Sequence, residues 1–298
     1  MQELAPIVLF VYNRPWHTQK TVEALLKNKL ANESNLFIFA DGPKNEEDSK
    51  KVSSVRSIIK SIRGFRTIQI IERERNWGLA DSVIKGVTEV IDNYGKVIVL
   101  EDDILSSTNF LKFINDALQF YENDNKIFSI SGYTFPIKIP SSYPYDVFIM
   151  YRSSSWGWAT WKNRWDKVDW EVSDFGKFLK NKDAKSLFNR GGDDLTPMLV
   201  KQMKGKIDSW AIRWAYAHYK EDAFCLYPVI SNIKNIGIDN TGTHSTKTKK
   251  FEVVLDNGQK KYKLIKNLTI DESIIQSMKR FSRLKFHKKM FNYIRYRL

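Results

Sequence analysis

The chain has 298 residues, of which 42% are hydrophobic and 13% aromatic, enough to form a sizeable buried core. No apolar stretch reaches the roughly 18 residues needed to cross a bilayer. The single cysteine, Cys225, cannot form an internal disulfide, and a strand-like segment begins at Ile7, which leaves no room for a signal peptide. These features argue against an integral membrane protein and a disulfide-stabilised secreted protein, and we expect a cytoplasmic location.

The formal net charge of +14 is concentrated at the C-terminal end. Residues 279–298 contain eight Lys or Arg and no acidic residue. Apolar residues alternate with these charges, and Phe281, Leu284, Phe291 and Ile294 lie on one helical face. The pattern is typical of a basic helix that binds an anionic membrane surface, and equally of a last helix packed on the body of the protein. The pattern favours either of these two interpretations over binding to nucleic acid.

In chain order, the first 130 residues alternate short apolar segments with amphipathic ones. Strands are predicted at residues 7–12, 36–40, 68–72, 97–100 and 127–131, each bounded by polar residues or glycine. Helices are predicted around Val55–Ile62 and Val83–Ile91, where apolar residues follow a helical period, and Asn93–Gly95 ends the second. This alternation predicts an α/β fold with a mostly parallel central sheet flanked by helices.

Polar clusters follow three of these strands, at Asn13–Pro15, Asp41–Pro43 and Glu101–Asp103. The first two are also ordinary turn sequences, and the three carboxylates could instead cap a following helix. Because ligands gather at the carboxyl ends of parallel strands, we expect the clusters to share one rim. Three adjacent carboxylates attract a cation, and oxygen ligands suit Mn²⁺ or Mg²⁺ bound together with a diphosphate. No glycine-rich phosphate loop occurs, so a metal would have to bind the phosphates.

The second half of the chain is less regular and rich in tryptophan. Residues 151–170 contain five of the nine tryptophans, whose rings either stack on a sugar or pack in the core. Asp208 precedes a helix-like segment that begins at Trp210; it is either an N-cap or a carboxylate base presented at the helix start. His244 lies in a Gly/Thr-rich loop and is either a metal or phosphate ligand or a structural residue. The other three histidines show no ligand spacing.

Taken in this order, the features resemble the GT-A glycosyltransferases, in particular the branch containing the animal enzyme that adds N-acetylglucosamine to the mannose core of N-glycans. The likeness covers residues 5–245 and rests on Asn13-Arg14, Asp41, Glu101-Asp102-Asp103, Gly157-Trp158 and Asp208 with Trp210. Asn76-Trp77-Gly78 is similar to the Asn-x-Gly donor loop of bacterial family-2-like sugar transferases. The resemblance implies a GT-A type, Rossmann-like sandwich.

The resemblance also implies roles for individual residues. Arg14 and Asp41 would contact the nucleotide base, together with Asn13, which stands where the animal enzyme has an acid. Asp102 would contact the ribose. Asp103 would hold the metal that bridges the diphosphate, with His244 as a second candidate ligand. Glu101 and Asn76 would support the donor, and Asp208 would deprotonate the acceptor hydroxyl. The acceptor side would be lined by Arg152, Trp156, Trp158 and Trp210.

The expected function is metal-dependent, inverting transfer of a hexosyl or N-acetylhexosaminyl group. The donor would be a nucleotide-diphosphate sugar, expected to be a UDP-sugar, and the acceptor a hydroxyl of a glycan or glycolipid in bacterial surface polysaccharide assembly. We expect a catalytic domain over residues 1–245, with a donor half to about 131 and an acceptor half from about 132. Residues 246–298 would form an extension that attaches the protein to the inner face of the membrane. The alternatives are a sugar-1-phosphate nucleotidyltransferase and a non-catalytic basic adaptor for membrane or nucleic acid.

Overall fold

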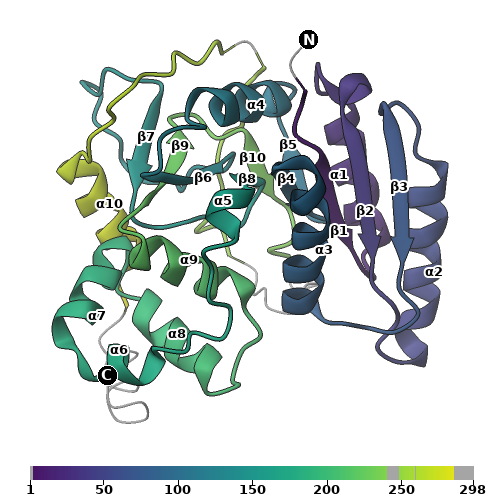
Figure 1. Cartoon of the computed structure of the whole chain (residues 1–298). Helices are drawn as coiled ribbons and strands as arrows, with labels where there is room; N and C mark the ends of the chain where they lie inside the picture. Colours follow the sequence, from purple (N-terminus) through teal and green to yellow (C-terminus); the bar gives the residue numbers. More distant parts are fainter. Residues whose placement is uncertain (1–2, 240–247, 259, 285–298) are drawn as a thin grey trace.

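The computed structural model describes residues 3–239, 248–258 and 260–284, which form an eight-stranded sheet, a two-stranded ribbon and surrounding helices (Figure 1). The strands are β1 (Ile7–Val11), β2 (Asn35–Ala40), β3 (Thr67–Glu72), β4 (Lys96–Glu101), β5 (Ile104–Ser106), β6 (Ile127–Ser131), β7 (Val147–Met150), β8 (Trp158–Trp161), β9 (Phe224–Pro228) and β10 (Ile233–Asn235). The α-helices are α1 (Pro15–Leu26), α2 (Glu46–Ser61), α3 (Leu79–Tyr94), α4 (Phe110–Phe120), α5 (Lys162–Trp165), α6 (Phe175–Lys180), α7 (Lys182–Phe188), α8 (Leu195–Met203), α9 (Trp210–Lys220) and α10 (Glu272–Ser282). Two short 3₁₀ helices, η1 (Ala31–Glu33) and η2 (Asn189–Gly191), complete the described elements.

The large sheet is mixed and mostly parallel, as the sequence predicts. Its strand order is β3-β2-β1-β4-β8-β6-β9-β7, and only β8 and β7 run against the other six strands. The five predicted strands correspond to β1, β2, β3, β4 and β6. Strand β1 is buried along its whole length, as its continuous apolar sequence requires for a strand covered on both faces. Helix α3 ends at Gly95, whose φ of 72° is left-handed, at the stop predicted from sequence.

Each face of the sheet carries its own hydrophobic core. Helices α1, α2, α4 and α10 supply buried side chains to one core. Helices α3, α5 and α9 supply them to the other, which is rich in tryptophan. This burial drives folding at roughly 25 cal/mol per Å² of apolar surface. The two cores fix the strands, and thereby the loops at the strand ends.

The chain order of the strands reverses beside β1. From β1 the chain moves outward through β2 to β3, and it then crosses to β4 on the other side of β1. In open α/β sheets such a switch point opens a crevice at the carboxyl ends of the two diverging strands, where ligands bind. Here those ends are followed by Tyr12–Arg14 and by Asp102–Asp103, so the topology itself points to these residues.

The two-stranded ribbon brings the residues after β10 beside these strand ends. Strand β10 pairs antiparallel with β5, directly after the acidic triplet, and Ile236 N donates to the carbonyl oxygen of Asp103 at 2.9 Å. A Cβ atom at Gly237 would lie 1.8 Å from Asp103 Oδ2 and 2.6 Å from Arg14 Nη1, so a larger residue there would displace these two side chains. The ribbon therefore holds Asp103 in place by its backbone.

The described part of the C-terminal extension packs on the body of the protein. Helix α10 buries Ile274, Ile275 and Met278, and Phe281 contacts the ring of Phe251. For residues up to Leu284 the packing alternative is therefore correct. Phe291, Ile294 and the remaining basic residues of the predicted membrane-binding helix lie outside the described residues. Within the described ranges, no helix has the length and apolar character needed to span a membrane.

Candidate functional site

The acidic triplet lies at the carboxyl end of β4, facing the loop that follows β1. Asp102 is 8% exposed, and its Oδ2 accepts a hydrogen bond from Tyr12 N at 3.3 Å. Thr21 in α1 donates to the carbonyl oxygen of Asp102 at 2.8 Å. The side chain of Asp102 is thus held by the residue that follows β1, and its backbone is held by α1. The first contact is expected for residues that share one rim of the sheet.

Burial makes the negative charge of this triplet unfavourable. It raises the pKa of Glu101 to about 8 and that of Asp102 to about 7, and in each case the charge of Asp103 raises the pKa further. Burial also raises the pKa of Asp103, although the guanidinium of Arg14 opposes this effect. A cation bound here would stabilise the ionised forms.

Arg14 is the cation that the chain itself supplies. Its Nη1 lies 2.8 Å from Asp103 Oδ2, and its Nη2 lies 3.3 Å from Asp239 Oδ1. His17 Nε2 lies 2.9 Å from Arg14 Nη2 and 3.0 Å from Asp239 Oδ2. The sequence predicts no role at the site for His17 or Asp239. His17 follows Arg14 by one helical turn, whereas Asp239 comes from the loop after β10 and has no local sequence signal.

The donor set at Asp103 fits a divalent metal bound together with phosphate. Asp103 Oδ1 is buried, and no hydrogen bond from the described residues reaches it. In the described part of the chain, no group of three or more His, Cys, Asp or Glu could hold a metal unaided. Mg²⁺ typically takes one or two carboxylates from the protein and fills its other positions with phosphate and water. His244, the second predicted ligand, lies outside the described residues.

Asp41 and Asn76 organise the loop that precedes α3. Asp41 accepts backbone hydrogen bonds from Gly42 at 3.0 Å, Trp77 at 2.9 Å and Gly78 at 3.2 Å. Asn76 Nδ2 donates to the carbonyl oxygen of Gly42 at 3.0 Å. Both predicted donor-site residues therefore lie on the expected rim, where their hydrogen bonds fix the shape of the loop.

Asn13 is held by a residue that sequence reasoning missed. Its Nδ2 donates to Asp48 Oδ1 at 2.7 Å, and Tyr12 Oη donates to Asp48 Oδ2 at 2.7 Å. These two bonds, led by that from Tyr12, lower the pKa of Asp48. Asp48 belongs to the first turn of α2 and joins that turn to the loop after β1.

Asp208 reaches the same rim from a distant part of the sequence. The N-cap of α9 is Ser209, whose side chain accepts from Ile212 N, so the interpretation of Asp208 as the cap of its own helix is wrong. Asp208 is exposed, and its Oδ2 accepts from Ala80 N at 3.4 Å, in the first turn of α3. The fold thus brings Asp208 beside the loop organised by Asp41.

The predicted acceptor residues are engaged in packing. Trp158 is 0% exposed and Trp210 2% exposed, and their rings stack on each other at 5.1 Å within the tryptophan-rich core. A sugar cannot stack on a ring whose faces are covered, so the packing alternative is correct for both. Arg152 forms a two-bond ion pair with Asp194 at 2.8 and 2.9 Å. Trp156 packs against Tyr133 and Phe251; the exposed tryptophans are Trp16 and Trp77, which both follow strand ends at the rim.

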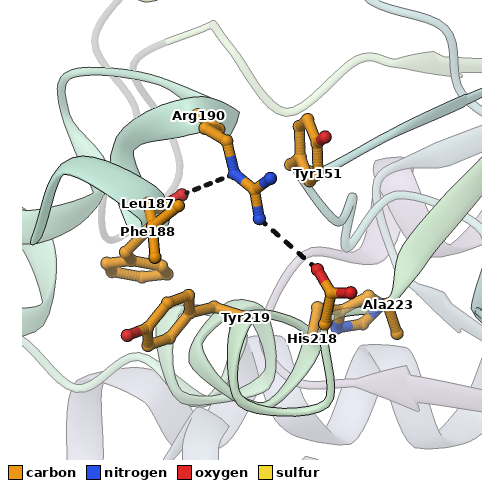
Figure 2. A pocket seen from close by; sticks show the side chains of 8 residues that line it. Tyr151, Leu187, Phe188, Arg190, His218, Tyr219 and Ala223 are labelled. Carbon is orange, nitrogen blue, oxygen red and sulfur yellow. Dashed lines mark hydrogen bonds and ion pairs between the residues drawn. The ribbon is translucent and has the colours of Figure 1, made fainter. Parts of the chain in front are cut away.

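A small cavity elsewhere in the fold carries no comparable chemistry. Figure 2 shows Arg190 beside Tyr151, with its side chain bonded to Leu187. The guanidinium carbon of Arg190 lies 3.9 Å from the centroid of the Tyr151 ring, and Nε donates to the carbonyl oxygen of Leu187 at 3.2 Å. The cavity has a volume of about 10 Å³, which is room for one water molecule at most. His218 in its wall is fully buried, and burial lowers its pKa to about 4, so it is neutral. The cavity is too small for a nucleotide.

No protein-family model and no curated protein matches the sequence. The chain is similar in fold to solved GT-A glycosyltransferase structures. TarS 1–349 from S. aureus has 9% identity over 76% of this chain and 59% of its own, with a TM-score of 0.41. A mannosyltransferase from Pyrobaculum calidifontis in complex with GDP-Man and Mn²⁺ has 10% identity over 63% of this chain and 55% of its own, with a TM-score of 0.34.

An active-site mutant of LgtC has 10% identity over 72% of this chain and 70% of its own, with a TM-score of 0.36. The chain spans less than two thirds of the length of the TarS and mannosyltransferase structures. Because every one of these TM-scores is below 0.5, we infer function from the chain's own residues.

Proposed function

We propose that the protein is a metal-dependent inverting glycosyltransferase that uses a nucleotide-diphosphate sugar, expected to be a UDP-sugar. One observation carries this proposal. An acidic triplet with Asp102 buried and its two neighbours partly buried lies at the topological switch point, and one carboxylate oxygen of Asp103 receives no hydrogen bond from the described residues. Such a site suits a divalent cation that arrives with the diphosphate of its substrate.

The chain's own residues would divide the binding of the donor between them. Asp103 Oδ1 would hold Mn²⁺ or Mg²⁺, which when bound neutralises negative charge on the leaving diphosphate. Arg14, 2.8 Å from Asp103, adds a fixed positive charge beside the same group. Asp102 would accept a hydrogen bond from the ribose. Asn13, held by Asp48, would contact the base from the end of β1.

Asp208 would act as the general base at this rim. Its exposed carboxylate would take the proton of the acceptor hydroxyl while that oxygen forms a bond to the anomeric carbon. At the same time the bond from the anomeric carbon to the diphosphate oxygen breaks. Attack from the face opposite the leaving group inverts the configuration in a single displacement.

The acceptor would be a glycan or a lipid-linked glycan at the inner face of a bacterial membrane. The formal charge of +14, with eight cations and no acid in residues 279–298, supports attachment to anionic lipid. Residues 1–245 would form the catalytic domain, and the described part of the extension packs on it through α10.

The experiment is to incubate the protein with a panel of nucleotide sugars and to measure nucleotide release with and without Mn²⁺. Calorimetric titration with UDP accompanies it. Asp103→Ala should abolish metal-dependent UDP binding and leave the fold intact, because it removes a ligand and also relieves carboxylate repulsion. Unchanged Mn²⁺-dependent UDP affinity in this variant would refute the metal assignment. Pyrophosphate release from a nucleoside triphosphate would indicate a nucleotidyltransferase, and no metal-dependent UDP binding would indicate an adaptor.

A further inference from the structure

Arg14 lies between two carboxylates that come from distant parts of the chain. Its Nη1 bonds to Asp103 Oδ2 at 2.8 Å, after β4, and its Nη2 contacts Asp239 Oδ1 at 3.3 Å, after β10. The side chain of Arg14 is 13% exposed and that of Asp103 16%, whereas that of Asp239 is 39% exposed. The inner carboxylate is therefore sheltered, and the outer one lies at the rim.

The guanidinium of Arg14 couples the position of Asp103 to that of Asp239. It is planar and rigid, so a bond that fixes Nη2 also fixes the direction of Nη1. Nη2 also contacts the carbonyl oxygen of Gly237 at 3.4 Å. Because Nη1 holds Oδ2 of Asp103, it also sets the direction of Oδ1, the oxygen to which no described residue donates.

His17 contacts both Arg14 and Asp239, but it cannot form a hydrogen bond to both of them at once. Its Nε2 is 2.9 Å from Arg14 Nη2, which can only donate, and 3.0 Å from Asp239 Oδ2, which accepts when ionised. One ring nitrogen either donates or accepts, so it satisfies one of the two at a time. The direct contact between Arg14 and Asp239 does not depend on which way His17 bonds, so it helps to position the guanidinium in either case.

We infer that Asp239 is a positioning residue for the metal–diphosphate site: it holds Arg14, and Arg14 orients Asp103 so that Oδ1 faces the metal. This inference rests on the proposed function. Carboxylates that bind metals are commonly oriented by hydrogen bonds from outer residues, and loss of such a residue costs roughly 10- to 100-fold in metal affinity. Asp239 thus acts without touching the substrate.

The test compares Asp239→Ala with Asp239→Asn in the full chain. Both substitutions remove the same negative charge, but asparagine keeps an oxygen that accepts from Arg14 Nη2. The measurement is the apparent Kd for Mn²⁺ at a fixed, saturating UDP concentration, by calorimetry. Asp239→Ala should weaken Mn²⁺ binding by about 10- to 100-fold, and Asp239→Asn should stay within about threefold of the wild type. Asp116→Asn, at an exposed ion pair on α4, is the unaffected control.

Two results would overturn the inference. If Asp239→Ala binds Mn²⁺ within about twofold of the wild type, Asp239 has no positioning role. If Asp239→Asn is as weak as Asp239→Ala, the effect comes from charge or from direct ligation of the metal by Asp239. Failure of the proposed function is distinct from both, because the wild-type protein itself would then show no Mn²⁺-dependent binding of UDP.

Discussion

Replacing Asp102 with asparagine should stabilise the metal-free protein at neutral pH. The carboxyl group is 8% exposed, and burial, followed by the charge of Asp103, raises its pKa from 3.8 to about 7. Asparagine has nearly the same volume and keeps an oxygen that accepts from Tyr12 N. The substitution therefore removes the buried charge while leaving the local hydrogen bond in place.

The size and sign of the effect follow from the two pKa values of Asp102. Between pH 3.8 and about 7 the unfolded chain loses this proton while the folded protein keeps it, so the free energy of unfolding of the wild type falls as pH rises. Each unit of pKa difference is worth about 1.4 kcal/mol, so the loss approaches roughly 4 kcal/mol above pH 7. The asparagine side chain does not titrate. The advantage of the Asp102→Asn variant should be small near pH 4 and reach about 2–4 kcal/mol at pH 8, because the remaining carboxylates also relax.

The assay is urea unfolding of both proteins at several pH values from 4.5 to 8, in EDTA, followed by tryptophan fluorescence. Asp116→Asn serves as the control, because Asp116 is exposed and pairs with Lys112 on the surface of α4. A stability difference that does not change with pH would refute the reasoning, as would a wild type more stable than Asp102→Asn at pH 8. Either result would mean that the carboxyl of Asp102 is ionised in the folded protein at no cost.

Two further predictions concern the rim and the C-terminus. Asp208→Asn should lower turnover by roughly 10²- to 10⁴-fold with little change in donor affinity; a loss below about threefold in steady-state kinetics would leave Asp208 only its hydrogen bond to α3. A protein ending at Leu284 should keep its melting temperature but lose co-sedimentation with anionic vesicles. A protein ending at Glu272 should unfold, because it lacks the core side chains of α10, each of which contributes roughly 2 kcal/mol to the free energy of unfolding. Equal vesicle binding by the full chain and the protein ending at Leu284 would show that the last residues are not the lipid-binding segment.

The parallel half of the sheet could be predicted because its strands are short apolar runs followed by polar clusters. The segment Trp158–Trp161 carries no such signal: β8 is buried on both faces, and its two outer tryptophans enter different cores. A tryptophan that stacks on a sugar and one that packs in a core look alike in a sequence, so the sequence leaves both alternatives open, and the acceptor role that the resemblance implies for Trp158 and Trp210 is wrong.

The acidic triplet could be located because it directly follows a predicted strand. Its surroundings could not, because they are long-range. Asp48 meets Asn13 from the first turn of the helix after β2, and Asp239 meets Arg14 across 225 positions of sequence. Neither has a local pattern that distinguishes it from a solvated surface carboxylate.

The ribbon of β5 and β10 has a consequence for how the protein is made. Residue Ile233 pairs with Ser106, so β5, which follows the acidic triplet, is synthesised more than 120 residues before its partner β10. At about 5–20 residues per second, the ribosome needs on the order of ten seconds to cover that distance. During this interval β1, β2, β3 and β4 can already associate. Asp103 has not yet formed the backbone hydrogen bond with Ile236, and Arg14 has not yet formed its ion pair with Asp239. Under the proposed function, the nascent chain would therefore not bind nucleotide until β10 has emerged from the ribosome.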